Sequence, residues 1–136
     1  MIVLDASMLV SAAMSRGSVP DLAMLRAFGS DRVAVSEAVM IELQNVFARP
    51  RLMRFIVPEL RDNVLSLLDA FGVLFTPTEP VFDCCDPKDN KYLELALVAR
   101  ADVIVSSDSD LLVLHPWRGV GILRPAEYLA SAVGPG

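Results

Sequence analysis

Short apolar runs alternate with longer segments of helical periodicity along most of the chain. Continuous aliphatic runs are typical of strands buried on both faces of a sheet. We expect such strands at residues 2–4, 32–35, 73–75 and 102–105, and a short fifth one at 121–123. Because strands and helices alternate, the pattern predicts a three-layer α/β/α sandwich with a central parallel sheet of four to five strands.

Capping residues and prolines set the expected helix boundaries. We expect helices at 7–14, from Pro20 to a closing Gly29, from the cap Ser36 to about 48, 58–72, 87–100, one turn at 110–114, and from Pro125 onward. Pro50 is expected to break the third of these. The chain has 136 residues and no internal repeat, so residues 1–136 are predicted to form one domain.

Composition excludes several classes of protein. The apolar fraction is 54%, yet no apolar run is long enough to span a membrane, and no positive region precedes the apolar N-terminal residues. We therefore expect a soluble cytoplasmic protein whose excess apolar content serves a core buried on both faces or an oligomer interface. Cys84 and Cys85 are adjacent and His115 is the only histidine, so a structural zinc site is not expected.

Five carboxylates are expected at one edge of the sheet, because ligands of open parallel sheets bind outside the carboxyl ends of the strands. Asp5 directly follows the first strand, and Asp108 and Asp110 follow the fourth. Asp89 lies in the first turn of the helix that begins at Pro87, and Glu42 lies two turns into the helix capped by Ser36, at the edge of its apolar face.

Such a group of acids needs a counter-ion. At about 4 Å, two carboxylates repel by about 4 kcal/mol at an effective dielectric constant of about 20. Oxygen-only ligands favour Mg²⁺ or Mn²⁺, with Asp5, Asp89, Asp108 and Asp110 as the expected ligands and Glu42 or Asp5 helping to orient a water molecule. The chemistry that follows is phosphodiester hydrolysis, in which one or two cations activate water and stabilise the leaving oxygen.

Each acid also has a simpler explanation. Asp5 could simply cap the first helix and bind no metal. Asp89 lies in the first turn of its helix, where an acid is favoured by the helix dipole without any metal. Asp108 and Asp110 could form Asx-turns, and Asp86 is better explained as a cap than as a ligand. Ser7, which follows Asp5 closely, could cap the helix or contact a metal-bound water, and the sequence does not choose between these.

The net charge of −5 argues against nucleic acid binding if taken alone. Without the five candidate acids, however, the chain would be neutral. Arg49, Arg51 and Arg54 form the one basic cluster and follow the helix that bears Glu42. They are candidate phosphate ligands, although a solvated helix terminus would also favour cations.

Four motifs, in order, resemble those of PIN-domain proteins. They are residues 2–7 (IVLDAS), Ser36 with Glu42, residues 86–96 (DPKDNKYLELA) and residues 105–112 (VSSDSDLL). The similarity covers nearly the whole chain and is greatest to bacterial toxins of toxin–antitoxin pairs, akin to VapC. A glycine is common in the family where this chain has Ser107.

The resemblance implies Mg²⁺- or Mn²⁺-dependent cleavage of RNA, a cognate antitoxin as partner, and a homodimer. Asp5, Glu42, Asp89 and Asp108 match the acidic quartet of the family, Asp110 matches a more variable acid, and Ser7 matches a small hydroxyl residue. The function expected is thus an endoribonuclease, the toxin of a type II toxin–antitoxin pair. Two alternatives remain: a non-catalytic module that acts through a protein partner, and a phosphate-transfer enzyme with Asp5 as nucleophile.

Overall fold

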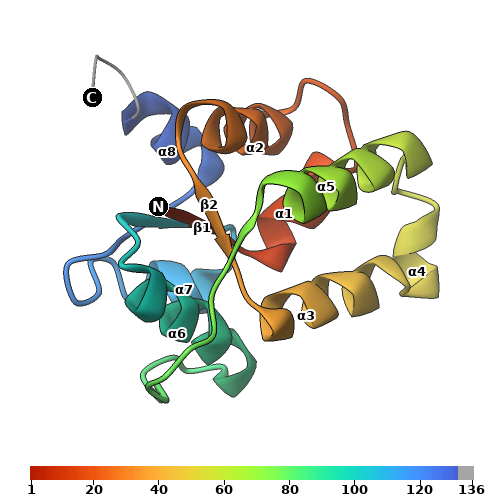
Figure 1. The fold of residues 1–136 in the computed structure, drawn as a ribbon. Helices are drawn as coiled ribbons and strands as arrows, with labels where there is room; N and C mark the ends of the chain where they lie inside the picture. The colour runs from red at the N-terminus through yellow and green to blue at the C-terminus, as the bar shows by residue number, and fades with distance from the viewer. Residues whose placement is uncertain (132–136) are drawn as a thin grey trace.

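A five-stranded sheet, in which every strand runs parallel to its neighbours, forms the centre of the computed structural model, which describes residues 1–131 (Figure 1). Residues 132–136 of the predicted domain lie outside the described residues. The strands are β1 (Ile2–Leu4), β2 (Val33–Val35), β3 (Val73–Leu74), β4 (Val103–Val105) and β5 (Gly121–Leu123), and their order is β3-β2-β1-β4-β5. The predicted parallel sheet is confirmed, and it has five strands where four to five were predicted.

The helices follow the predicted pattern with local differences. They are α1 (Ala6–Ala12), α2 (Val19–Ser30), α3 (Glu37–Phe47), α4 (Pro50–Met53), α5 (Pro58–Phe71), α6 (Asn90–Ala99), α7 (Ser109–Leu112) and α8 (Pro125–Ser131), and a 3₁₀ turn, η1 (Pro87–Asp89), precedes α6. Gly29 does not close α2, which continues to Ser30. Pro50 follows the end of α3 as predicted, but it also begins α4, because proline is compatible with the first turn of a helix.

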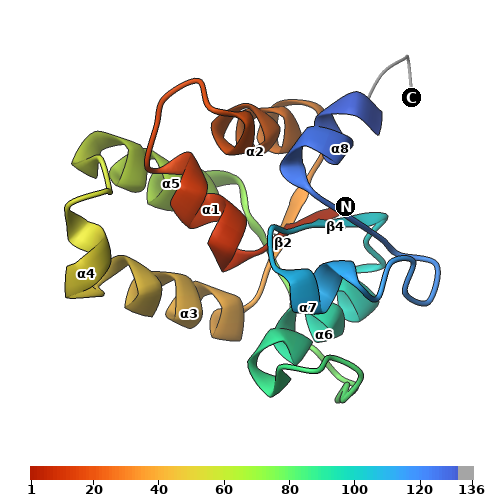
Figure 2. The ribbon, with the colours of Figure 1, turned by 180° about the vertical axis from the view of Figure 1, so that it is seen from behind.

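The helices form layers on both faces of the sheet. Figures 1 and 2 show α6 on the opposite side of the strands from α1 and α5. Helix α6 contacts β1, β2 and β4, whereas α5 packs on β2 and α1 packs against α2, α3 and α5. In the described part of the chain, no helix is long and apolar enough to cross a membrane.

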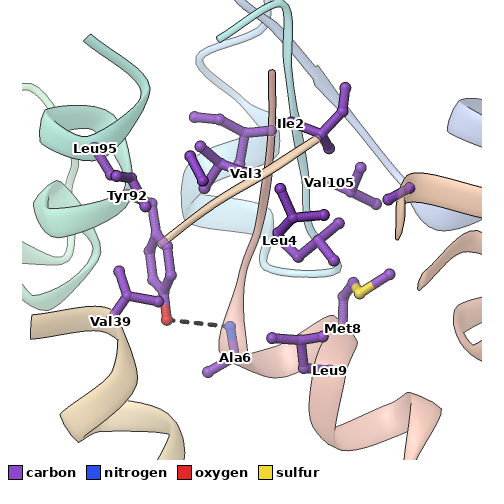
Figure 3. Close-up of a cluster of buried hydrophobic side chains, with 14 of the residues drawn as sticks. Ile2, Val3, Leu4, Ala6, Met8, Leu9, Val39, Tyr92, Leu95 and Val105 are labelled. Atoms are coloured by element: carbon purple, nitrogen blue, oxygen red, sulfur yellow. Dashed lines mark hydrogen bonds between the residues drawn. The ribbon is translucent and has the colours of Figure 1, made fainter. Parts of the chain in front are cut away.

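The core surrounds the central strand. All residues of β1 are buried, because this strand is covered on both faces (Figure 3). Tyr92 and Leu95 of α6 approach β1 from one side and Met8 and Leu9 of α1 from the other (Figure 3), and all four are at most 1% exposed. Burial of each such side chain contributes about 1.5–3 kcal/mol to stability.

The topology places a crevice at the carboxyl ends of β1 and β4. From β1 the chain continues to β2 on one side, while β4 pairs with β1 on the other side. Such a reversal of strand order is where open α/β sheets bind ligands. The register pairs Leu4 with Val105, so Asp5 and Ser106 leave the sheet side by side.

Candidate metal centre

A cleft of about 360 Å³ lies where β1 and β4 end. Five acids, two cations, two hydroxyl residues and four apolar residues line it: Asp5, Glu42, Asp86, Asp89 and Asp108; Arg49 and Lys88; Ser7 and Tyr92; Ala6, Val10, Val46 and Leu52. Four of the five acids predicted from the sequence therefore share one cleft. The fifth, Asp110, is brought close to Asp86 and Asp89 although it is not among the lining residues.

Asp5 caps α1 and also lines the cleft, so its capping role does not exclude a role as a metal ligand. Its carboxylate accepts hydrogen bonds from the Met8 N–H at 2.9 Å and from the hydroxyls of Ser7 and Ser106. The side chain is 2% exposed. Burial raises the pKa of Asp5 to about 6, since the hydrogen bonds that favour its ionised form only partly offset the loss of hydration.

Ser106 connects the two strand ends that carry the acids. Its hydroxyl donates to Asp5 and accepts a hydrogen bond from the Asp108 N–H at 2.9 Å. The Asp108 carboxylate in turn accepts from the Asp110 N–H at 2.9 Å and caps α7, which is the Asx-type geometry considered above. The backbone φ of Ser107 is not positive, so the departure from the common glycine is accommodated.

Asp89 is a buried acid with an oxygen that accepts no hydrogen bond within residues 1–131. Its side chain is 7% exposed, and one carboxylate oxygen, Oδ2, is buried without a hydrogen-bond partner among the described residues. Burial, followed by hydrogen bonding with Asp108 and by repulsion from Asp108, Asp86 and Glu42, raises the pKa of Asp89 to about 7. A buried oxygen of this kind is costly unless a cation or proton meets it.

Asp86, Asp89 and Asp110 form a group in which one oxygen of each carboxylate lies within 4.8 Å of the others. Asp86 also accepts a hydrogen bond from the Lys88 N–H at 3.0 Å, as its predicted capping role requires. The structure therefore adds Asp86 to the acids that could hold a metal ion.

Glu42 is held by two residues of α6 that the sequence analysis did not single out. Lys91 forms an ion pair with one carboxylate oxygen, and the Tyr92 hydroxyl donates to the other. The same hydroxyl accepts a hydrogen bond from the Ala6 N–H at 3.1 Å (Figure 3). Burial and the adjacent Glu42 raise the pKa of Tyr92, so its hydroxyl remains a proton donor. No local pattern in the sequence connects Lys91 or Tyr92 with Glu42, because the contact joins α6 to α3 across about 50 residues.

The three predicted arginines are separated by the bend between α3 and α4. Arg49 lines the cleft. Arg51 and Arg54 are exposed and do not line it, and the Arg54 guanidinium lies 4.7 Å from the centre of the Phe55 ring. Ser7 lies at the cleft with its hydroxyl on Asp5, at 2.8 Å from the nearer oxygen.

Comparison with known proteins decides the family. The family model described as PIN domain matches residues 1–110, a segment that contains every acid of the cleft. The chain belongs to the PIN domain family. An uncharacterized protein of Methanocaldococcus jannaschii is 26% identical over 118 residues, which cover 84% of this chain and 74% of that protein.

PIN domains are generally nucleases that use divalent metal ions, and the site of this PIN domain fits such an ion. The donors around Asp89 are carboxylate oxygens, which suit Mg²⁺ or Mn²⁺. Asp89, which has an unpartnered Oδ2, belongs to the same group as Asp86 and Asp110. A divalent cation there would neutralise the repulsion that raises the pKa of Asp89.

Proposed function

We propose that this PIN domain is an Mg²⁺- or Mn²⁺-dependent endoribonuclease that hydrolyses RNA phosphodiester bonds. The observation that carries the proposal is that Asp89, which has a buried oxygen without a hydrogen-bond partner, groups with Asp86 and Asp110. A pocket that serves only protein contacts has no need for such a destabilising arrangement, so the non-catalytic alternative is the weaker one.

We propose that the aspartates of the site bind the cation and that Glu42 orients the attacking water. Asp89, Asp108, Asp110 and Asp5 would hold the cation, with Asp86 added from the structure. When bound, the cation supplies Lewis acidity toward a phosphate oxygen and lowers the pKa of a water molecule. Glu42, fixed by Lys91 and Tyr92, presents a carboxylate that can orient the attacking water and accept its proton.

The positive side chains at the cleft give phosphate a place to bind. Arg49 and Lys88 both line it, and Arg51 and Arg54 extend the positive charge along the surface beyond α3. Ser7 keeps Asp5 in place through its hydroxyl and lies where substrate would enter. We propose these residues as the substrate-binding set.

Cleavage of a labelled single-stranded RNA by purified protein in Mg²⁺, Mn²⁺ or EDTA tests the function. Asp108→Asn should abolish cleavage, and Asp69→Asn, an exposed aspartate of α5 outside the cleft, should not change it. Metal-dependent cleavage that is lost only in Asp108→Asn is the expected result. A folded wild-type protein that binds no Mg²⁺ or Mn²⁺ by calorimetry would overturn the proposal and favour the non-catalytic module.

The biological role that we propose is the toxin of a type II toxin–antitoxin pair, active in the cytoplasm as a homodimer and inhibited by an antitoxin. The likeness to VapC-type proteins supports the role, and exposed apolar side chains such as Phe71 and Leu74 support self-association. Induced expression should arrest growth with the wild type and not with Asp108→Asn. Light scattering of the purified protein gives its oligomeric state, and a monomer would contradict the dimer.

A further inference from the structure

The cleft has two ends of different chemistry. Four aspartates and Glu42 lie at the ends of β1 and β4 and beside α6, whereas Val46, Arg49 and Leu52 come from the end of α3 and from α4, which lie away from α6 (Figures 1 and 2), and Val10 lies one turn along α1. Val46 lies four residues after Glu42 on α3, so the two side chains share one face of that helix, about 6 Å apart along its axis. An apolar surface therefore begins one helical turn from the acids.

We propose that this apolar end, bounded by Val10, Val46, Leu52 and Arg49, is a nucleobase subsite that holds one unpaired base beside the phosphate to be cleaved. The inference rests on the proposed ribonuclease function and deepens it by placing one base of the RNA in the cleft. Arg49 contacts a phosphate or stacks on the base, and the aliphatic side chains cover one face of the ring.

The apolar end is prepared for a flat, partly apolar ligand. Val46 and Leu52 are only half-buried and turn apolar surface toward the cleft. Covering such surface contributes about 25 cal/mol per Å² to binding. A nucleobase can cover this apolar surface with one face of its ring. Its polar edge then remains at the open side of the cleft, where water or Arg49 can form hydrogen bonds with it.

The charge around this end favours nucleic acid over an apolar peptide. Residues 43–58 contain three arginines and no acid, although the whole chain has a net charge of −5. Within residues 1–131, Arg49 forms no salt bridge with an acid, so its guanidinium is available to phosphate. The adjoining acids would repel an acidic peptide, whereas a cation held by them attracts a phosphate.

The size of the cleft selects unpaired RNA. A volume of about 360 Å³ is at the small end for ligand sites and has no room for a double helix. A base can enter only after it has left its stack, which is easiest in loops and single strands. The same stretch of RNA in a duplex would present its backbone to the cleft but not its base.

Methyl NMR with Mg²⁺ present tests the subsite without any cleavage. Uridine and adenosine 5′-monophosphate should shift the methyl signals of Val46 and Leu52 and bind about tenfold more tightly than ribose 5-phosphate. Equal affinity for the nucleotides and ribose 5-phosphate, or shifts confined to residues outside the cleft, would overturn the subsite.

A kinetic cycle connects the subsite to cleavage. Removing the base next to the cleaved bond, by an abasic substitution in the RNA, should lower kcat/KM of the wild type about tenfold. Val46→Trp, which fills the subsite, should lower kcat/KM on the intact RNA and respond to the abasic substitution by less than twofold. Leu52→Ala gives a second variant if Val46→Trp does not fold. The matched control is Val19→Trp on α2, at a position 45% exposed and outside the cleft, which should behave as the wild type.

The outcomes separate this inference from the function on which it rests. If wild-type protein cleaves RNA and abasic substitution changes kcat/KM by less than twofold at every position, the subsite is wrong and the ribonuclease stands. If wild-type protein cleaves no RNA, the ribonuclease proposal fails, and the NMR comparison of nucleotides with ribose 5-phosphate still decides the subsite.

Discussion

Replacement of Asp89 by asparagine should stabilise the metal-free protein at pH 8 and remove its response to divalent cations. At this pH the wild-type carboxylate is ionised, buried to 7% exposure and left with an unpartnered oxygen. Asparagine has nearly the same shape and no charge. The variant therefore removes the repulsion from Asp108, Asp86 and Glu42 together with the metal ligand.

The magnitude follows from the pKa of Asp89, which rises from 3.8 to about 7. At 1.36 kcal/mol per pKa unit, the ionised form would lower stability by about 4 kcal/mol at most. The cleft is open to water, which screens these charges, so about 1–2 kcal/mol is expected. Loss of the favourable contact between an acid and the start of α6, about 0.5 kcal/mol, is smaller and does not reverse the sign.

Thermal unfolding at pH 8 measures both effects. In EDTA, Asp89→Asn should raise Tm by about 3–8 °C. Mn²⁺ at about 100 times its Kd should raise the unfolding free energy of the wild type by about 2.7 kcal/mol and leave the variant nearly unchanged. Asp69→Asn, which neutralises an exposed aspartate of α5, should match the wild type in both conditions.

Two results would refute the reasoning separately. A Tm of Asp89→Asn below that of the wild type in EDTA would mean that the carboxylate is not an uncompensated charge. An equal stabilisation of variant and wild type by Mn²⁺ would mean that Asp89 is not a metal ligand, whatever its effect on the metal-free protein.

Three further predictions concern the same cleft. Because burial raises the pKa of Asp5 to about 6 and that of Asp89 to about 7, protonation of these acids stabilises the folded protein. The Tm in EDTA should therefore fall as the pH rises from 5 to about 7 and level off above it. A Tm that rises over this range would contradict the raised pKa values. Tyr92→Phe removes the hydroxyl that bridges the Ala6 N–H of α1 and the Glu42 carboxylate of α3. The free energy of unfolding should fall by about 1–2 kcal/mol, and kcat should fall with little change in KM. An unchanged kcat would rule out that Tyr92 positions Glu42. Arg49→Gln should raise KM several-fold and Arg51→Gln much less, because only Arg49 lines the cleft; equal effects would show that the whole basic cluster binds RNA.

Local sequence determined the elements that carry the acids. Aliphatic runs such as residues 2–4 and 103–105 were predicted to be strands, because such runs suit a strand that is covered on both faces, and both form central strands of the sheet. Ser36 caps α3 as predicted, which sets the position of Glu42 two turns later. Since parallel strands end at one edge, the sequence predicted Asp5 and Asp108 at the same edge of the sheet, and the pairing of β1 with β4 brings them close together.

The partners of those acids were decided by the tertiary structure. Lys91 and Tyr92 reach Glu42 only because α6 packs beside α3, a contact between residues about 50 positions apart. Asp86 joins Asp89 and Asp110 because the 3₁₀ turn before α6 lies beside the start of α7. No local pattern encodes these distances.

The basic cluster shows the same division. The sequence determined that Arg49, Arg51 and Arg54 lie close together after α3. The bend between α3 and α4 decided that Arg49 alone of the three lines the cleft, since Arg51 and Arg54 lie two and five residues further along, past the start of α4, and point in other directions. Propensity and periodicity determine which residues a segment presents, whereas the packing angles between segments determine which of them meet.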